Sequence, residues 1–88
     1  MIDQDIINRT KKVFVEFFEI EEARLLPEAN IFTDLGLDSL DIVDLIVALQ
    51  NQFGIKIRSE EDVRNIRTLQ DLYQFIAAVM AREAAKKH

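Results

Sequence analysis

The stretch DLGLDSLDIVDLIVALQNQFG, residues 34–54, contains a helix start, a helix interior and a helix stop in that order. Asp38 is a residue type that favours the N-cap, and Asp41 stands where an acid helps to hold the first turn. The apolar pattern runs to Phe53 and stops at Gly54, a residue that commonly ends helices. The sequence therefore predicts a helix that begins at Ser39 and ends near Phe53.

This helix has two apolar sides when its residues are placed at about 100° per residue. The wider side is the expected core face and holds Ile42, Leu45, Ile46, Leu49 and Phe53. A second stripe of Leu40, Val43 and Val47 faces elsewhere, and Ser39 lies between the two sides. Either a small domain buries both sides, or the stripe is an apolar strip with a polar rim, as in transient protein-binding sites.

The flanking sequence predicts three further helices. Residues 3–19 have a core face of Ile6, Ile7, Val13, Phe14, Phe17 and Phe18. A long loop with Pro27 and Gly36 follows, and we expect Leu25, Ile31, Phe32 and Leu35 to hold it on the core. A short helix from Ser59 to Ile66 and a last helix from Thr68 complete the pattern, with residues 82–88 expected to fray. We predict an all-α four-helix bundle in a single domain, residues 1–88, with a long loop between helices one and two and a short helix three.

Composition excludes several classes of function. The 88 residues include no cysteine, and the only histidine is His88, so a Ser-His or Cys-His nucleophile pair has almost nothing to work with. No Gly-x-Ser-x-Gly motif surrounds Ser39, and the aspartates at 34, 38, 41 and 44 lack the spacing of a calcium loop. We expect no enzyme and no metal site. With no signal pattern and no apolar run of about 20 residues, we expect a soluble, cytoplasmic protein. We also expect it to be a monomer.

Charge is distributed unevenly along the chain. The net charge is −5, and residues 25–55 contain five acids and no Lys or Arg. Acids near a helix start also suit the helix dipole, which is an equally good account of Asp38 and Asp41. The other account is a docking surface for a basic partner, and the same sign disfavours nucleic acid.

Residues 32–57 closely resemble the central segment of acyl carrier proteins, in which Asp-Ser-Leu follows a leucine-glycine turn and opens the second of four helices. The matching positions are Leu35-Gly36, Asp38-Ser39-Leu40-Asp41, Val43, Leu45, Ala48-Leu49, Phe53 and Ile57. The resemblance covers nearly the whole chain, because the flanking predicted helices agree in length and order.

The resemblance implies that Ser39 is the attachment point of 4′-phosphopantetheine, donated from coenzyme A by a phosphopantetheinyl transferase. Acyl groups would then be carried as thioesters on the prosthetic thiol, which a chain without cysteine cannot supply itself. Asp38 and Leu40, on either side of the attachment point, would take part in binding the cofactor. A phosphodiester there would lie near free backbone N–H groups at the helix start.

The same resemblance implies a partner surface and an acyl cavity. Leu40, Asp41, Val43, Asp44 and Val47 would bind the transferase and the acyl-loading and acyl-processing synthases through basic docking surfaces on those enzymes. The residues that match the family's acyl cavity are Ile46, Leu49, Ile57, Ile66, Leu69 and Phe75. Each of these six is equally well explained as ordinary core.

Three departures from the family pattern point away from a housekeeping role. Where fatty-acid carriers typically continue with glutamates, this chain has Gln50-Asn51-Gln52, then Gly54 and Lys56, and Arg58 replaces a frequent proline. One extra residue is present around Asp62-Val63. The expected function is a carrier that delivers acyl intermediates to partner enzymes in fatty acid, polyketide or related biosynthesis. The departures favour a dedicated pathway of polyketide, lipid-modification or nonribosomal peptide type within that class. An aminoacyl or peptidyl carrier and an unmodified helical interaction domain are the alternatives.

Overall fold

The computed structural model describes residues 3–57 and 66–86. Within these ranges lie three α-helices, α1 (Gln4–Phe18), α2 (Ser39–Phe53) and α4 (Leu69–Lys86), and one short 3-10 helix, η1 (Glu22–Arg24). The prediction of an all-α fold is confirmed for this part of the chain. The short helix predicted from Ser59 to Ile66 lies outside the described residues, apart from Ile66 itself, which is buried.

A side-chain cap begins α1, and a residue in a left-handed conformation ends it. The Asp3 carboxylate accepts a hydrogen bond from the Asp5 backbone N–H at 3.1 Å and so caps the first turn. At the other end Glu19 adopts a left-handed conformation, and its N–H donates to the Phe14 carbonyl. Within the helix the buried Thr10 hydroxyl donates to the Ile6 carbonyl at 2.7 Å, which satisfies a polar group in the core.

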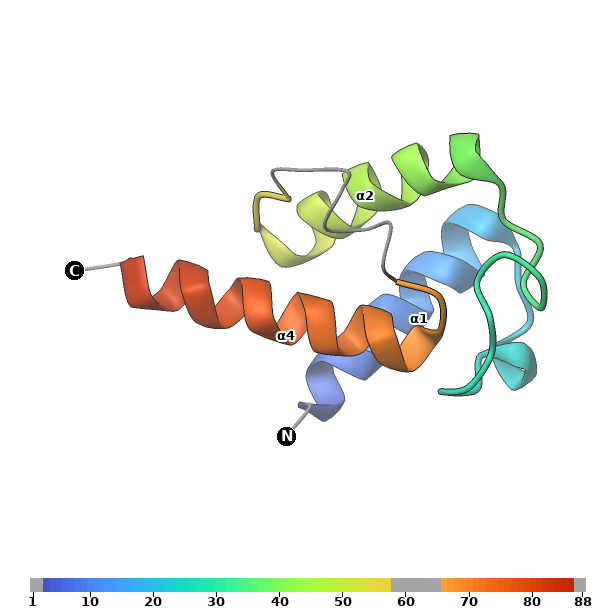
Figure 1. Cartoon of the computed structure of the whole chain (residues 1–88), viewed down its shortest axis with the longest axis horizontal. Coiled ribbons are helices and arrows are strands. Elements are labelled where there is room, and N and C mark those ends of the chain that lie inside the picture. The colour runs from blue at the N-terminus through green and yellow to red at the C-terminus, as the bar shows by residue number, and fades with distance from the viewer. Residues whose placement is uncertain (1–2, 58–65, 87–88) are drawn as a thin grey trace.

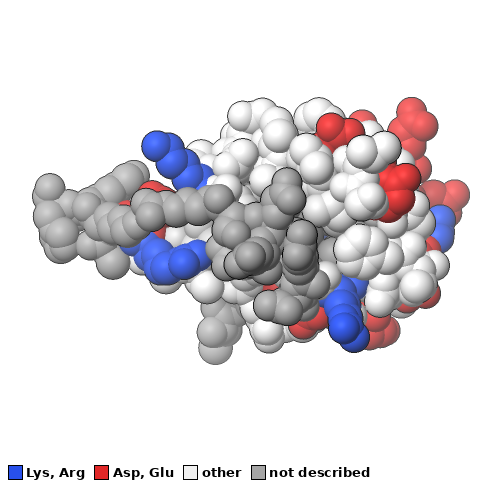
Figure 2. Space-filling view, turned by 45° about the horizontal axis from the view of Figure 1, so that its top comes forward, with Lys and Arg blue, Asp and Glu red and all other residues white. Residues whose placement is uncertain are grey.

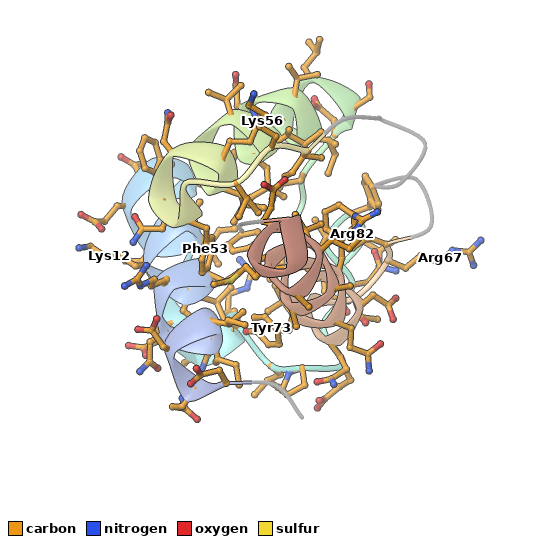
Figure 3. All side chains as sticks on the ribbon, turned by 90° about the vertical axis from the view of Figure 1, so that its left-hand side faces the viewer. Lys12, Phe53, Lys56, Arg67, Tyr73 and Arg82 are labelled. Atoms are coloured by element: carbon orange, nitrogen blue, oxygen red, sulfur yellow. The ribbon has the colours of Figure 1, made fainter. Side chains whose placement is uncertain are left out.

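The three helices share one core (Figure 1). α1 contacts both α2 and α4, and in this view α2 lies above the other two helices. On the predicted core face of α2, Leu45 and Leu49 are buried, whereas Ile42, Ile46 and Phe53 are partly buried and packed against the core. Phe53 also faces α1, where the Arg9 guanidinium lies 6.0 Å from its ring centroid (Figure 3).

The long loop between α1 and α2 is tied to the start of α4 by backbone hydrogen bonds. The Ile31 N–H donates to the Arg67 carbonyl at 2.8 Å, and the Leu69 N–H donates to the Ala29 carbonyl at 3.1 Å. These bonds flank an isolated antiparallel bridge between Asn30 and Thr68. The loop therefore has a defined path across one end of the molecule.

The predicted anchors of this loop are confirmed in three cases and wrong in one. Leu25, Ile31 and Leu35 are buried, but Phe32 is exposed. The reason is a tight turn that the Asn30 side chain closes, because its Oδ1 accepts from the N–H groups of Phe32 (2.8 Å) and Thr33 (3.0 Å). Phe32 lies in this turn, where it is 39% exposed and does not belong to the core cluster.

The first turn of α4 is closed by a reciprocal cap. The Asp71 N–H donates to the Thr68 hydroxyl at 3.2 Å, and the Thr68 N–H donates to the Asp71 carboxylate at 3.2 Å. α4 then stays helical to Lys86. The stretch expected to fray, residues 82–88, thus begins inside the helix, and its fraying stays a prediction.

Candidate functional site

Ser39 is the first residue of α2, and two aspartates fix its position. Asp38 Oδ1 accepts from the N–H groups of Leu40 (3.0 Å) and Asp41 (2.9 Å). Asp41 Oδ2 in turn accepts from the Asp38 N–H at 3.1 Å, which completes a capping box. The predicted helix start is confirmed, and the backbone that carries Ser39 is held from both sides.

The Ser39 side chain itself is open to solvent. Within residues 3–57 and 66–86, its hydroxyl takes part in no hydrogen bond, since the cap is made by Asp38 and Asp41 instead. A hydroxyl that is exposed and has no hydrogen-bond partner in the described part of the chain is accessible to an enzyme that would modify it.

The Leu40, Val43 and Val47 stripe lies on the surface. Leu40 is 76% exposed, Val43 49% and Val47 50%. The interpretation in which both apolar sides of α2 are buried is therefore wrong. Three apolar side chains in a row on one exposed helix face form a patch of the kind that binds proteins.

Acidic side chains accompany this stripe. Asp44 is exposed and Asp41 partly so, and α2 carries no Lys or Arg. In Figure 2 most of the acidic side chains in view lie toward the right-hand end, where α2 begins, beside a broad area without charge. The surface around Ser39 is thus apolar at its centre and negative at its edge.

The six residues matched to the acyl cavity all belong to the core. Leu49, Ile66 and Leu69 are buried, and Ile46, Ile57 and Phe75 are partly buried and packed against the same cluster. Ile57 is held there by its N–H, which donates to Gln50 Oε1 at 2.9 Å. The structure brings these residues together around one interior, and their role in sheltering an acyl chain stays a prediction.

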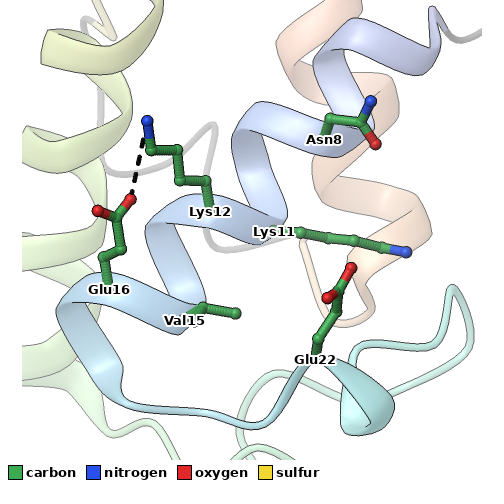
Figure 4. Close-up of a pocket in the computed structure, with 6 residues that line it drawn as sticks. All are labelled: Asn8, Lys11, Lys12, Val15, Glu16 and Glu22. Atoms are coloured by element: carbon green, nitrogen blue, oxygen red, sulfur yellow. Dashed lines mark ion pairs between the residues drawn. The ribbon is translucent and has the colours of Figure 1, made fainter.

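Two other features of the described residues bear on chemistry. One hollow lies between α1 and η1, where Asn8, Lys11, Lys12, Val15, Glu16 and Glu22 line it (Figure 4). Lys11 and Glu22 extend toward each other there, and Lys12 pairs with Glu16 at 4.0 Å, so the hollow favours neither sign of charge. Across residues 3–57 and 66–86, no group of three or more His, Cys, Asp or Glu side chains is placed to hold a metal ion.

Comparisons with known proteins agree on one family. A family model described as "Phosphopantetheine attachment site" matches residues 8–76. "Acyl carrier protein 2" of Ralstonia nicotianae (strain ATCC BAA-1114 / GMI1000) is 38% identical over 81 residues, which are 92% of this chain and 99% of that protein. The chain belongs to the acyl carrier protein family.

Membership in the acyl carrier protein family settles the general activity. Such a protein is a carrier and not an enzyme, its cofactor is phosphopantetheine, and it interacts with phosphopantetheinyl transferases and synthases. In the part of the chain that the structure describes, no helix combines the length and the apolar character needed to cross a membrane. The cofactor supplies the thiol to which acyl groups are bound.

One sequence expectation about the cofactor stays a prediction. We expected a phosphodiester on Ser39 to lie near free N–H groups, but those of Leu40 and Asp41 already donate to Asp38. The carboxylate has the place that an anion would take at many helix N-termini. The N–H of Ser39 itself donates to no acceptor within residues 3–57 and 66–86, so the expected approach of a phosphodiester to a free N–H group stays a prediction.

Sequence reasoning also placed Phe17 wrongly. It lies on the predicted core face of α1, yet its side chain is 69% exposed. α1 ends at Phe18, so the last turn reaches the margin of the core, where Phe18 still packs against the core cluster and Phe17 does not. Helical periodicity alone does not predict the exposure of Phe17. It shows which side of the helix is apolar but not where the packing against other segments ends.

Proposed function

We propose that Ser39 Oγ is the attachment point of 4′-phosphopantetheine and that this carrier presents acyl groups on that arm to partner enzymes. The observation that supports the proposal most strongly is the Ser39 hydroxyl itself, exposed at the first residue of α2 on a doubly capped backbone. A fixed attachment point lets one docking geometry serve both the transferase and the enzymes that later handle the acyl group.

The electrostatic surroundings of Ser39 support a basic partner. Asp38, Asp41 and the exposed Asp44 place negative charge around the attachment point, and residues 25–55 supply no Lys or Arg. A phosphodiester at Ser39 would add a further negative charge to this surface. Lys and Arg side chains of a transferase or synthase would offset that repulsion on docking.

The docking surface in this proposal consists of Leu40, Asp41, Val43, Asp44 and Val47. Its apolar centre supplies buried area and its acidic residues supply orientation and association rate. Leu40, Val43 and Val47 are each exposed by about half or more in the free protein. A partner can therefore cover them without unfolding α2. The cavity residues Ile46, Leu49, Ile57, Ile66, Leu69 and Phe75 complete the proposal as the shelter for the acyl chain.

We further propose that the carrier serves a dedicated pathway of polyketide, lipid-modification or nonribosomal peptide type. Support comes from the C-terminal half of α2, where Gln50, Asn51 and Gln52 carry no charge. Gln50 has a structural role as well, since its side chain holds the Ile57 N–H. A surface that is acidic near Ser39 and neutral farther along α2 discriminates against partners that require negative charge along the whole helix.

Intact-mass measurement tests the attachment. The protein is incubated with coenzyme A and a promiscuous phosphopantetheinyl transferase, beside Ser39→Ala and Ser59→Ala, which changes the other serine of the chain. We expect one phosphopantetheinyl group on the wild type and on Ser59→Ala, and none on Ser39→Ala. Modification of Ser39→Ala would contradict the proposed site, and no modification of any form would favour an unmodified interaction domain.

A second step tests the cargo. With octanoyl-coenzyme A in place of coenzyme A, we expect the protein to gain the mass of the octanoylated arm. Neutral hydroxylamine should then remove the octanoyl group while the arm stays attached. A thioester is cleaved by hydroxylamine under conditions that leave a serine phosphodiester intact. Loss of the whole added mass would contradict attachment of the arm through a phosphodiester.

A further inference from the structure

Phe17 forms one wall of an open groove between α1 and α2. The groove is lined by Phe17, Phe18, Asp44, Val47, Ala48 and Asn51 and has a volume of about 300 Å³. Asp44 is the charged residue of this lining, and the walls are otherwise apolar or neutral. Phe17 is 69% exposed beside this open groove. Covering its ring with an apolar group of a partner would lower the free energy of the complex.

This α1–α2 groove is continuous with the exposed stripe on α2. Val47 belongs to both, since it is half exposed on the stripe and also lines the groove. At about 100° per residue, the stripe lies between Ser39 on one side of α2 and the groove residues on the other. A partner seated on the stripe therefore overlies the edge of the groove.

The distance from Ser39 to the groove residue Val47 is short enough for one docked protein to cover both. Val47 follows Ser39 by eight residues, which is a rise of about 12 Å along the helix. A standard interface buries about 800 Å² on each partner, a patch roughly 30 Å across. An enzyme whose active site receives the Ser39 hydroxyl therefore also covers the groove if it docks along α2.

We propose that the phosphopantetheinyl transferase that modifies this carrier docks across α2 onto α1, placing an apolar side chain against Phe17 in the α1–α2 groove and a Lys or Arg beside Asp44. This inference rests on the proposed attachment at Ser39 and extends its docking surface to a second helix. Phe17 is the anchor residue of that extension, and Asp44 gives it a charge preference.

The charge of the groove argues for this occupant over a second copy of the chain. A symmetric dimer through this face would bring Asp44 and the acidic start of α2 of both copies toward each other, with no Lys or Arg from residues 25–55 to offset them. A transferase with a basic docking surface has the complementary sign. The groove and stripe together thus fit a basic, apolar docking element.

Transferase kinetics test the proposal. The probe is one phosphopantetheinyl transferase that modifies the wild-type chain, and the variants are Phe17→Ala and Phe17→Lys. The control is Val15→Lys, because Val15 is also an exposed apolar residue of α1 but points about 200° away from Phe17. For Phe17→Lys we expect KM to rise roughly fivefold to tenfold, the loss typical of an interface anchor, with kcat changed less than about twofold.

Folding is checked in parallel, since a misfolded variant would mimic lost docking. The melting temperatures of all variants should stay within about 3 °C of the wild type, because surface substitutions seldom shift stability more. Phe17→Ala removes the ring without adding charge, so a raised KM in this variant assigns the effect to the ring itself.

Each remaining outcome decides the proposal. Equal KM values for Phe17→Lys and Val15→Lys would overturn the extension to α1 while leaving attachment at Ser39 intact. Absence of any mass gain on the wild type would overturn the proposed function and this inference together. A wild-type dimer in sedimentation that Phe17→Lys dissociates would assign the groove to a second copy and overturn the transferase as its occupant.

Discussion

At the scale of single residues, the two aspartates around Ser39 have a structural task as well as a charge. Asp38 satisfies two N–H groups at the start of α2, and Asp41 returns the bond to Asp38. Ser39 makes no comparable bond within the described residues. The side chain that holds the helix start and the side chain proposed to carry the arm are therefore different residues, and mutation can separate their roles.

Asp38→Ala should lower the free energy of unfolding by about 1 kcal/mol, because two helix N–H groups lose their acceptor. Urea denaturation monitored by circular dichroism measures this loss. Ser39→Ala is the matched control and should change the free energy by less than about 0.5 kcal/mol. A larger loss for Ser39→Ala than for Asp38→Ala would show that the serine has the structural role.

Among the residues that the structure describes, Tyr73 has a buried hydroxyl without a hydrogen-bond partner. Its side chain is buried on the inner side of α4 (Figure 3). Burial also raises the pKa of this phenol, since the ionised form is poorly solvated there.

Tyr73→Phe should therefore raise the free energy of unfolding by roughly 1 kcal/mol, because it removes a buried polar group and keeps the packing of the ring. The midpoint of urea unfolding at neutral pH checks this. Unfolding at a lower urea concentration than the wild type would mean that the hydroxyl makes a stabilising bond.

At the scale of elements, local signals predicted the helix boundaries and missed the contacts between distant segments. The Asp38 cap and the Gly54 stop are read directly from residue types, and α2 begins and ends where they indicate. The bridge between Asn30 and Thr68 depends on backbone groups that any residue carries, so no pattern of side chains marks it. Phe17 was misplaced for a related reason, since periodicity gives the direction of a side chain and not what lies opposite.

Asp71 at the start of α4 makes the stability of the fold depend on pH. The N–H groups of Arg67 and Thr68 donate to the Asp71 carboxylate and lower the pKa of Asp71. A lowered pKa in the folded state means that ionised Asp71 stabilises the fold above the pKa that it has in the unfolded chain. That contribution is lost as the pH falls through the folded-state pKa.

Asp71→Asn should therefore destabilise the protein at neutral pH and weaken the decline of stability below about pH 4, where the carboxylate of the wild type becomes protonated. Thermal unfolding measured between neutral pH and strongly acidic pH gives both quantities. An equal loss of melting temperature in wild type and variant over the acid range would show that Asp71 does not contribute to this pH dependence.

At the scale of the whole molecule, α2 has one side that packs in the core and another that is exposed to solvent. The side of α2 that faces α1 completes the core, and another side presents Leu40, Val43 and Val47 with the acidic Asp44 along one edge. The sequence predicted both faces but left open whether the second was buried, because a helical wheel does not show how far neighbouring helices wrap around. A single domain, a monomer and a cytoplasmic location stay predictions.

Val43→Lys should weaken docking of a transferase or synthase about tenfold and change the free energy of unfolding by less than about 0.5 kcal/mol. The expected split follows from the exposure of Val43 in the free protein and from the introduction of a positive charge opposite a basic partner. KM measurements and urea denaturation of the same sample separate the two effects. Unfolding of the variant would show that the stripe belongs to the core.

The central claim is that Ser39 carries the phosphopantetheine arm, and fragmentation mass spectrometry of the modified protein tests it most directly. After reaction with coenzyme A and a transferase, proteolytic peptides are sequenced to locate the added group. The account predicts the whole modification on Ser39, at the capped start of α2. A modification on any other residue, or an unmodified Ser39 in protein that has gained the mass of the arm, would contradict it.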